Sequence, residues 1–270
     1  MQTSPSRAAE SLLAFWAEAG VDVCLNETPV DRLAEGAARL KARPQAAPVA
    51  HRPQQVQKNA APDVSSAVAD AKRLAAEAQD LEQLAAAIAA FEGCTLRHEG
   101  ARQAVFSRGN PEAPLMIIGE GPGGEEDLKG EPFVGRAGQL LDRMLAAAGL
   151  TGRVFITNTV FWRPPGNRTP TTAEQMVCAP FVERAIQLVN PKILMLAGGA
   201  SAKFLLKREE GILALRGRWF EWKSEDETVA LPALPTLHPA FLLRQPAAKK
   251  KAWTDLLTLT ERLDRPDRPA

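Results

Sequence analysis

Residues 114–138 constrain the fold more than any other part of this sequence. The unbroken apolar run 115–118 ends in a turn rich in Gly and Pro, which predicts a buried parallel strand followed by a tight loop. From Gly138 onward, apolar residues recur at helical spacing until Gly149, a typical helix stop. A strand, a loop and a helix in this order build ligand sites beyond the carboxyl ends of strands in α/β sheets.

The same alternation of strand and helix continues to the end of the chain. Core strands are predicted at 115–119, 154–157, 193–197 and 233–237, and a short edge strand at 104–107. The fold class that this order predicts is a three-layer α/β/α sandwich with a central four-stranded, mainly parallel sheet. The segment around Arg216 to Trp219 is interpreted as a charged excursion, and Thr171 and Glu174 as a capping box that begins a helix.

The N-terminal part of the sequence has a different character. Residues 1–40 are interpreted as a helical arm, and residues 41–63, rich in Ala, Pro and Gln, as a flexible linker. Residues 64–270 then form the α/β domain, led by a further helical pattern that ends near Phe91. The arm carries no recognisable chemistry, so we interpret it as a docking or interaction segment.

Charge and cysteine content restrict the classes of function. The 33 basic and 32 acidic residues give a formal net charge of +1, so contact with nucleic acid requires a local basic face. The three cysteines are scattered, which is typical of a reducing compartment. No apolar run is long enough for a membrane span, and no signal peptide is recognisable. We expect a cytoplasmic monomer without a membrane partner.

Three of the predicted strands end in residues that carry chemistry. Glu120, with the carboxylates at 125–127, follows the first core strand, Asn158 closes the second, and His238 follows the fourth. Parallel strands place their carboxyl ends at one edge of the sheet, so we expect these side chains to share a pocket.

The sequence resembles the uracil-DNA glycosylase superfamily, and most closely its family 4 branch. The matching segments occur in the family's order and span 94–263. They are Gly-Glu-Gly-Pro-Gly-Gly-Glu-Glu-Asp (119–127), Pro-Phe-Val-Gly (132–135), Ile-Thr-Asn (156–158), Arg-Pro-Pro-Gly-Asn-Arg (163–168) and His-Pro-Ala-Phe-Leu-Leu-Arg (238–244). Each segment alone is weak, and their combination is highly specific.

The resemblance implies a DNA repair enzyme that flips uracil out of DNA and hydrolyses its N-glycosidic bond. It implies that Asn158 reads the extruded base, because an amide offers one donor and one acceptor that match O4 and N3–H of uracil. Phe133 would stack on that base, and a neutral His238 would donate to uracil O2 as negative charge develops there. The structural alternatives are a strand-capping Asn, a core Phe and a His-Pro turn.

The resemblance also implies how DNA is held. Leu242 or Leu243 would fill the gap left by the flipped base, with Arg244 near a phosphate. Alternatively, both leucines pack in the core. Further contacts to DNA are assigned to Arg163 and Arg168, whereas Gly121 and Gly123, in a turn that exposes backbone N–H groups, are assigned to substrate binding.

Glu120 and Glu126 complete the catalytic set that we predict. Several other branches of the superfamily place a catalytic Asp after the position of Glu120, where this chain has Gly121. Glu126 would orient a water molecule, favour the cationic sugar, or exclude a thymine methyl, and the sequence leaves these three roles open. Glu125 and Asp127 are typical of a solvated acidic loop.

This sequence departs from family 4 at the cysteines. Family 4 enzymes hold a four-iron cluster on four cysteines, of which Cys94 and Cys178 match two, whereas Arg97 and Trp162 stand at the other two. Two thiolates do not satisfy such a cluster, and recruiting Cys24 would require the arm to fold over. We therefore predict no iron–sulfur cluster and no metal, with Trp162 packing in that space.

The leading hypothesis is a monofunctional uracil-DNA glycosylase acting on uracil-containing DNA. No lysine matches a Schiff-base motif, and the related branch that bonds covalently to the sugar carries a His in an insertion that this chain lacks. The alternative is a binder of uracil or abasic DNA that does not turn over. A nucleotide-binding enzyme with a phosphate-cradling loop is a third, weaker hypothesis, because no Walker or Rossmann motif is present.

Overall fold

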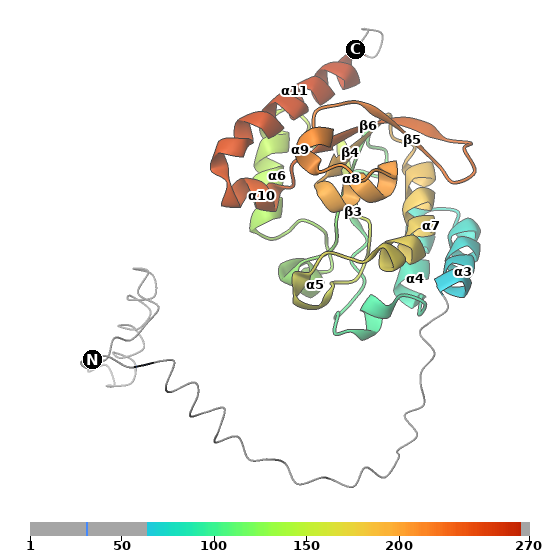
Figure 1. Cartoon of the computed structure of the whole chain (residues 1–270). Coiled ribbons are helices and arrows are strands. Elements are labelled where there is room, and N and C mark those ends of the chain that lie inside the picture. Colours follow the sequence, from blue (N-terminus) through green and yellow to red (C-terminus); the bar gives the residue numbers. More distant parts are fainter. Residues whose placement is uncertain (1–30, 32–63, 266–270) are drawn as a thin grey trace, which may run out of the picture. The chain divides into compact units, whose positions relative to one another are not determined.

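The computed structural model describes Asp31 and residues 64–265. Contacts divide the chain into two units, Met1–Gln57 and Lys58–Ala270, and the described helices and strands all belong to the second unit (Figure 1). Apart from Asp31, the predicted arm at 1–40 and linker at 41–63 lie outside the described residues.

A six-stranded sheet forms the centre of the domain, in the order β1-β3-β2-β4-β6-β5. The four inner strands are parallel to one another, and the two outer strands run antiparallel to their neighbours. The strands are β1 (Ser107–Gly109), β2 (Leu115–Gly119), β3 (Val154–Asn158), β4 (Ile193–Ala197), β5 (Phe220–Lys223) and β6 (Ala230–Thr236).

Alternate residues of the inner strands face two separate apolar layers. Along β2, Met116 and Ile118 belong to one core cluster, whereas Leu115 and Ile117 belong to the other. Both faces of the sheet are therefore covered, as expected for parallel strands made of continuous apolar runs. This arrangement confirms the predicted three-layer α/β/α class.

Two groups of helices cover these faces. The first layer contains residues of α3 (Val64–Glu77), α4 (Leu81–Ala90), α7 (Thr172–Val189) and α8 (Gly199–Leu206). The opposite layer contains residues of α6 (Arg136–Ala147) and α11 (Lys249–Asp264), and Figure 1 shows α11 and α7 on opposite sides of the sheet. The short elements are η1 (Thr95–His98), α5 (Gly124–Lys129), η2 (Pro165–Asn167), α9 (Ile212–Leu215), α10 (Pro239–Arg244) and η3 (Pro246–Ala248).

The sequence predicted the four inner strands but not all of the edges. The first edge strand lies at Ser107–Gly109, later than the predicted 104–107. β5 was missed because it is short and only one of its residues is buried: Trp222 is buried, whereas its neighbours Glu221 and Lys223 are exposed. The sheet therefore has six strands, not four.

The helix boundaries follow local capping chemistry. The capping box is present, because Thr171 accepts from the Glu174 N–H at 3.3 Å and Glu174 accepts from the Thr171 N–H at 2.7 Å. The pattern that ends near Phe91 is divided into two helices, α3 and α4, since Asp80 caps a new start by accepting from the Gln83 N–H at 2.7 Å. In the part of the chain that is described, no helix is long and apolar enough to cross a membrane.

Candidate active site

The site lies where the inner strands end. In the parallel register, Gly119 at the end of β2 pairs with Asn158 at the end of β3. Ala197 of β4 pairs with Thr236 of β6, and His238 follows as the N-cap of α10. The predicted convergence of these strand ends therefore brings Asn158 and His238 to the same edge of the sheet.

Gly119 leaves the space in which the site residues meet. A Cβ at this position would lie 2.4 Å from Oδ1 of Asn158 and 2.6 Å from the ring of Phe133. The Phe133 ring in turn lies 5.5 Å from the His238 ring, centroid to centroid. Phe133 thus contacts the space beside Asn158 and lies near the His238 ring, and a side chain larger than hydrogen at position 119 would displace Asn158 and Phe133.

The Asn158 amide is buried and incompletely bonded. Only 1% of its surface is exposed, and its Oδ1 is the one buried side-chain N or O atom without a hydrogen-bond partner in the described part of the chain. Leaving a buried acceptor unpaired costs about 1–3 kcal/mol. Such an atom in a folded protein calls for a partner from outside the chain, such as an ordered water, an ion or a bound ligand.

Phe133 is held in a conformation that is unfavourable by itself. Its φ of 54° is left-handed, which costs about 1–3 kcal/mol for a residue with a Cβ. Arg108 offsets this cost, because Nε donates to the Pro132 carbonyl at 2.8 Å and Nη2 to the Phe133 carbonyl at 3.2 Å. Gly138 allows α6 to approach, since a Cβ there would overlap the Phe133 carbonyl. Arg108 was not predicted, because no motif marks it.

Glu126 ties the glycine-rich turn to the loop that carries Phe133. Its carboxylate accepts from the backbone N–H groups of Gly123 at 3.1 Å, Val134 at 3.0 Å and Gly135 at 2.9 Å. The Gly123 N–H is therefore engaged within the protein. Three donors fix the orientation of this carboxylate. Glu126 therefore positions the loop, and it also places a negative charge beside the site.

His238 is neutral over the physiological range. Burial, together with the nearby positive charge of Arg244, lowers its pKa to about 4, and the charge of Glu126 opposes this shift. Nδ1 accepts from the Ala240 N–H at 3.2 Å. A neutral imidazole carries one proton, so accepting at Nδ1 places that proton on Nε2. His238 is therefore a fixed donor through Nε2–H.

A second set of contacts fixes the strand ends. The Thr159 hydroxyl donates to the Glu120 carbonyl at 2.6 Å and accepts from Gln175 at 3.0 Å. Thr236 donates to Asp255 at 2.8 Å, and Arg216 donates to the same carboxylate at 3.0 Å. The Glu120 side chain is itself half-buried, and Gly121 packs near Val160, whose methyl would lie 2.8 Å from a Cβ there.

Comparison with known proteins decides the family. Residues 106–257 match the model of the uracil DNA glycosylase superfamily. The chain belongs to that superfamily. It is similar to the type-4 uracil-DNA glycosylase of Pyrobaculum aerophilum, with 38% identity over 66% of this chain and 91% of the relative.

Two further type-4 relatives give the same result. The type-4 uracil-DNA glycosylase of Sulfurisphaera tokodaii is 38% identical over 58% of this chain and 74% of its own length. That of Thermotoga maritima is 38% identical over 54% of this chain and 75% of its own length. Within the superfamily, this chain is therefore similar to the type-4 branch, as its motifs indicated.

The residues assigned to DNA contact differ in their surroundings. Leu242 is fully buried in a cluster with Leu140 and Leu237, whereas Leu243 is only partly buried and Arg244 is exposed. Of the two leucines considered for the wedge, Leu243 is thus the one at the surface.

The two arginines of the 163–168 loop also have partners within the protein. Arg168 forms a bidentate ion pair with Glu174, at 2.9 and 2.6 Å, and reaches Glu99 at 3.3 Å. Arg163 donates to Asn167 at 2.7 Å and its guanidinium packs over Gly124. Both arginines therefore hold the loop, and Arg168 has less freedom to contact phosphate than the sequence implied.

The two cysteines that match family 4 positions lie close together in the core. Cys94 and Cys178 are both buried, with their Sγ atoms 4.0 Å apart, and burial raises the pKa of Cys178 well above its usual value. Arg97 donates to the Phe91 carbonyl at 3.2 Å and pairs with Glu92 at 3.0 Å.

Trp162 is buried in the same apolar core cluster as Cys94 and Cys178. Its ring lies 6.5 Å from that of Phe91 and 6.2 Å from that of Phe161. Within residues 64–265, no group of three or more His, Cys, Asp or Glu side chains is arranged to hold a metal ion, and Cys24 lies outside the described residues. A cluster that requires four thiolates does not fit the two cysteines, Cys94 and Cys178, in the part of the chain that the structure describes.

Proposed function

We propose that this protein is a monofunctional uracil-DNA glycosylase that hydrolyses the bond between uracil and deoxyribose and leaves an abasic site. The single observation that carries this proposal is the unpaired Oδ1 of Asn158, which adjoins the Phe133 ring and lies at the same strand edge as the donor of His238. The type-4 relatives, named uracil-DNA glycosylases, support it.

Asn158 supplies the recognition of uracil. Its Oδ1 would accept from uracil N3–H, and its Nδ2 would donate to O4. Cytosine presents an acceptor and a donor in the reverse arrangement, so two buried polar contacts would be lost with the wrong base. Phe133 provides an apolar face against which an extruded base stacks.

His238 stabilises the leaving group without transferring a proton. As the C1′–N1 bond breaks, the electron pair stays on N1 and negative charge spreads to O2. The Nε2–H of a neutral imidazole donates a hydrogen bond to this oxygen. This hydrogen bond strengthens as the negative charge grows, which lowers the free-energy barrier to cleavage. A pKa of about 4 keeps the imidazole neutral at pH 7 and maintains a preorganised donor.

Water completes the reaction. Its oxygen bonds to C1′ of the cationic sugar, and the proton it loses passes through solvent to the uracil anion. Glu126 lies near His238 and carries a fixed negative charge, which favours the cationic sugar. We assign Glu120 to the same wall of the pocket. None of the residues assigned to the pocket is a lysine, so we propose hydrolysis without a Schiff base.

We propose that the enzyme works without an iron–sulfur cluster. Trp162, Arg97 and the thiol pair Cys94–Cys178 would together stabilise the segments that a cluster joins in family 4 members. The contacts of Arg97 with Phe91 and Glu92 join η1 to the end of α4. The packing of Trp162 joins the segment after β3 to the same region.

The test is to incubate the protein with oligonucleotides that contain one uracil, single- and double-stranded, and then to treat them with alkali. Strand cleavage over many turnovers, with free uracil released and no cleavage before alkali, is the expected result. Matched oligonucleotides with thymine or cytosine at that position are the controls. A stable complex without released uracil would instead support a non-turnover binder. If the protein neither cleaves nor preferentially binds the uracil oligonucleotide relative to the thymine and cytosine controls, both the glycosylase and the binder hypotheses are excluded.

A further inference from the structure

A protein of almost zero net charge needs a local basic face to contact DNA, and Arg163 and Arg168 are engaged within the protein. Four other basic side chains lie together in the sequence at the end of α10 and the start of α11. All four are exposed, and they are Arg244, Lys249, Lys250 and Lys251. The charge of Arg244 acts on His238, whose pKa it lowers. This basic face therefore begins at the candidate site.

The basic face is not neutralised by carboxylates. None of its four side chains has an ion-pair partner among the residues that the structure describes. Asp142 of α6 and Asp255 of α11 each pair with an arginine outside the face, and α10 and η3 contain no acidic residue. Glu261 and Asp264 lie roughly three turns or more beyond the lysines. The face therefore attracts an anion.

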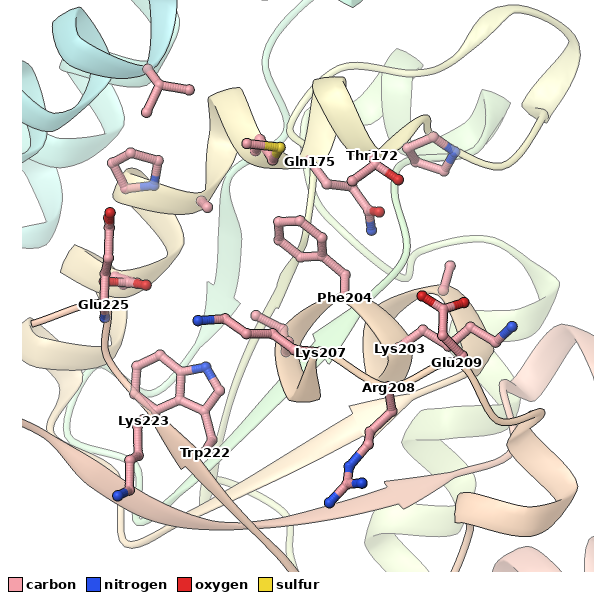
Figure 2. Close-up of a pocket in the computed structure, with 18 of the residues that line it drawn as sticks. Thr172, Gln175, Lys203, Phe204, Lys207, Arg208, Glu209, Trp222, Lys223 and Glu225 are labelled. Atoms are coloured by element: carbon pink, nitrogen blue, oxygen red, sulfur yellow. The ribbon is translucent and has the colours of Figure 1, made fainter. Parts of the chain in front are cut away.

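A larger hollow elsewhere on the surface lacks this charge. The groove between α7 and α8 has a volume of about 610 Å³, and Figure 2 shows Lys203 and Lys207 of α8 beside it. Its other basic side chains form ion pairs, and these two lysines stand against Glu183 and Glu209. That groove therefore carries no net positive charge, and α8 offers exposed lysines for a matched control.

An apolar pocket adjoins the basic face. It has a volume of about 310 Å³ and is lined by Met144 of α6 and by Lys249, Lys250 and Trp253 of α11. The Trp253 side chain is 36% exposed, and no carboxylate lines the pocket. An exposed aromatic ring beside basic side chains is the combination that binds single-stranded nucleic acid, because the ring stacks on a base while the cations hold the phosphates.

The pocket is continuous with the segment assigned to the wedge. Met144 and Leu243 pack against the same apolar cluster, which contains Leu242. Figure 1 shows α10 next to α6 and to the first turns of α11, and η3 joins α10 to α11. A strand whose uracil enters the candidate site, and whose gap Leu243 fills, therefore meets the basic face next.

We infer that the basic face and its pocket bind the DNA strand beside the flipped uracil, with one unpaired base stacked on Trp253 and the adjoining phosphates held by Lys249 and Lys250. This inference rests on the proposed glycosylase function. An acidic peptide would also pair with the lysines, but continuity with Arg244 and Leu243 favours the nucleic acid. Bases in a duplex are already stacked on their neighbours, so this contact favours single-stranded DNA.

The first test varies the position of uracil in a single strand: in the middle, near the 5′ end or near the 3′ end. Cleavage is measured under single-turnover conditions over a range of enzyme concentrations. Removing the flank that reaches Trp253 is expected to raise the concentration for half-maximal rate and to leave the maximal rate nearly unchanged, because the flank binds equally in the ground state and the transition state. Removing the other flank is expected to have a smaller effect.

The second test uses variants of the face and a uracil-free single strand, with binding followed by fluorescence anisotropy. Trp253→Leu keeps an apolar side chain without a ring and is expected to weaken binding at least about fivefold, whereas Trp253→Phe is expected to retain more of the affinity. Lys249→Ala combined with Lys250→Ala is expected to reduce the slope of log affinity against log salt by about 1.4, since each phosphate contact on a single strand contributes about 0.7.

The matched control, Lys203→Ala combined with Lys207→Ala, removes the same charge from α8 on the opposite face of the sheet. It is expected to bind DNA like the wild type. Circular dichroism verifies the folding of each variant. Stacking on a base is also expected to quench the fluorescence of Trp253, and this DNA-dependent quenching is expected to disappear in Trp253→Phe, since Trp162 and Trp222 are buried.

Three results would overturn this inference. The first is that folded variants of Trp253 and of the two lysines bind single strands as tightly as the α8 control. The second is that the same variants weaken duplex binding as much as single-strand binding. The third is that a polyglutamate peptide competes as strongly as a single strand of equal charge, since the face would then bind any polyanion. Uracil release with any of these results leaves the proposed function intact, whereas a protein that neither binds DNA nor releases uracil fails on both counts.

Discussion

The ring of Phe133 lies 5.5 Å from the ring of His238, centroid to centroid, with 31° between their planes. These residues are far apart in sequence and come from different elements, a loop before α6 and the N-cap of α10. Their proximity gives the proposed base pocket an apolar wall and a hydrogen-bond donor, and the amide of Asn158 lies close to the same ring.

Replacing His238 by Ala is expected to slow glycosidic cleavage by at least about tenfold, and by as much as about a thousandfold, because one preorganised donor to the leaving group is removed. Single-turnover rates on uracil-containing single strands measure this effect. His238→Asn retains a short donor and is expected to lie between the wild type and His238→Ala. Wild-type rates in both variants would remove His238 from the mechanism.

The lowered pKa of His238 has a consequence for stability. The folded state holds the imidazole neutral down to about pH 4, whereas in the unfolded chain it takes up a proton near pH 6.5. The unfolded state therefore binds more protons between these values, and stability falls as pH drops from about 6.5 to about 4, by about 2–3 kcal/mol. Urea unfolding of the wild type and of His238→Asn across this range measures the difference. Parallel curves would show that the imidazole is not the cause.

Asn158→Ala is expected to abolish most activity without lowering stability by more than about 1 kcal/mol, because removing an unpaired buried acceptor offsets the lost packing. Thr157→Val is the matched control. Thr157 is also buried, and its hydroxyl donates to the Phe106 carbonyl at 2.7 Å. Losing this hydrogen bond is expected to lower the free energy of unfolding by about 1–3 kcal/mol while activity is retained. Equal destabilisation by the two substitutions would contradict the role of Asn158 as a ligand-binding group.

Glu126→Gln is expected to reduce cleavage more than the neighbouring Glu125→Gln. A Gln side chain replaces one acceptor oxygen with an NH₂ group, which opposes either the Gly123 N–H or the pair from Val134 and Gly135. The Phe133 loop would then lose part of its anchor, whereas Glu125 is exposed. Steady-state rates and affinity for uracil DNA measure both variants, and identical behaviour of the two would refute a special role for Glu126.

Cys94→Ser is expected to retain activity within about threefold, because a small polar substitution beside Cys178 costs on the order of 1 kcal/mol of stability and disturbs no proposed catalytic group. Iron content and visible absorbance of freshly purified wild-type protein are measured alongside. A brown wild-type protein containing iron, with loss of colour and activity in Cys94→Ser, would show that a cluster forms in spite of Arg97 and Trp162.

The inner strands, and the edge of the sheet at which their carboxyl ends meet, were predictable from local signals. β2 and β4 are continuous apolar runs buried on both faces, and such runs have few alternatives to a parallel strand. β5 escaped prediction because Trp222 is its only fully buried residue, and four residues with a single buried position do not establish a period. The break between α3 and α4 depends on one side chain, the N-cap Asp80. An Asp at this position is also compatible with a continuous helix, so the sequence did not predict the break.

The roles of charged and wedge residues were less predictable. The sequence assigned Arg168 to DNA, yet its carboxylate partners include Glu99, 69 positions away. It treated Leu242 and Leu243 alike, and the orientation of α10 buries the first and leaves the second partly exposed. Arg108 carried no signal at all, because its role depends on the loop that its guanidinium reaches.

The sequence by itself determined the layered α/β class, the order of strands whose ends carry Glu120, Asn158 and His238, and the departure from four cysteines, since each depends on residue type and spacing along the chain. Tertiary structure alone decided that Asn158 keeps an unpaired oxygen, that His238 donates through Nε2, and that Glu126 holds the Phe133 loop. Hydrogen bonds and burial depend on which distant groups come within a few ångströms, and local sequence does not encode those distances.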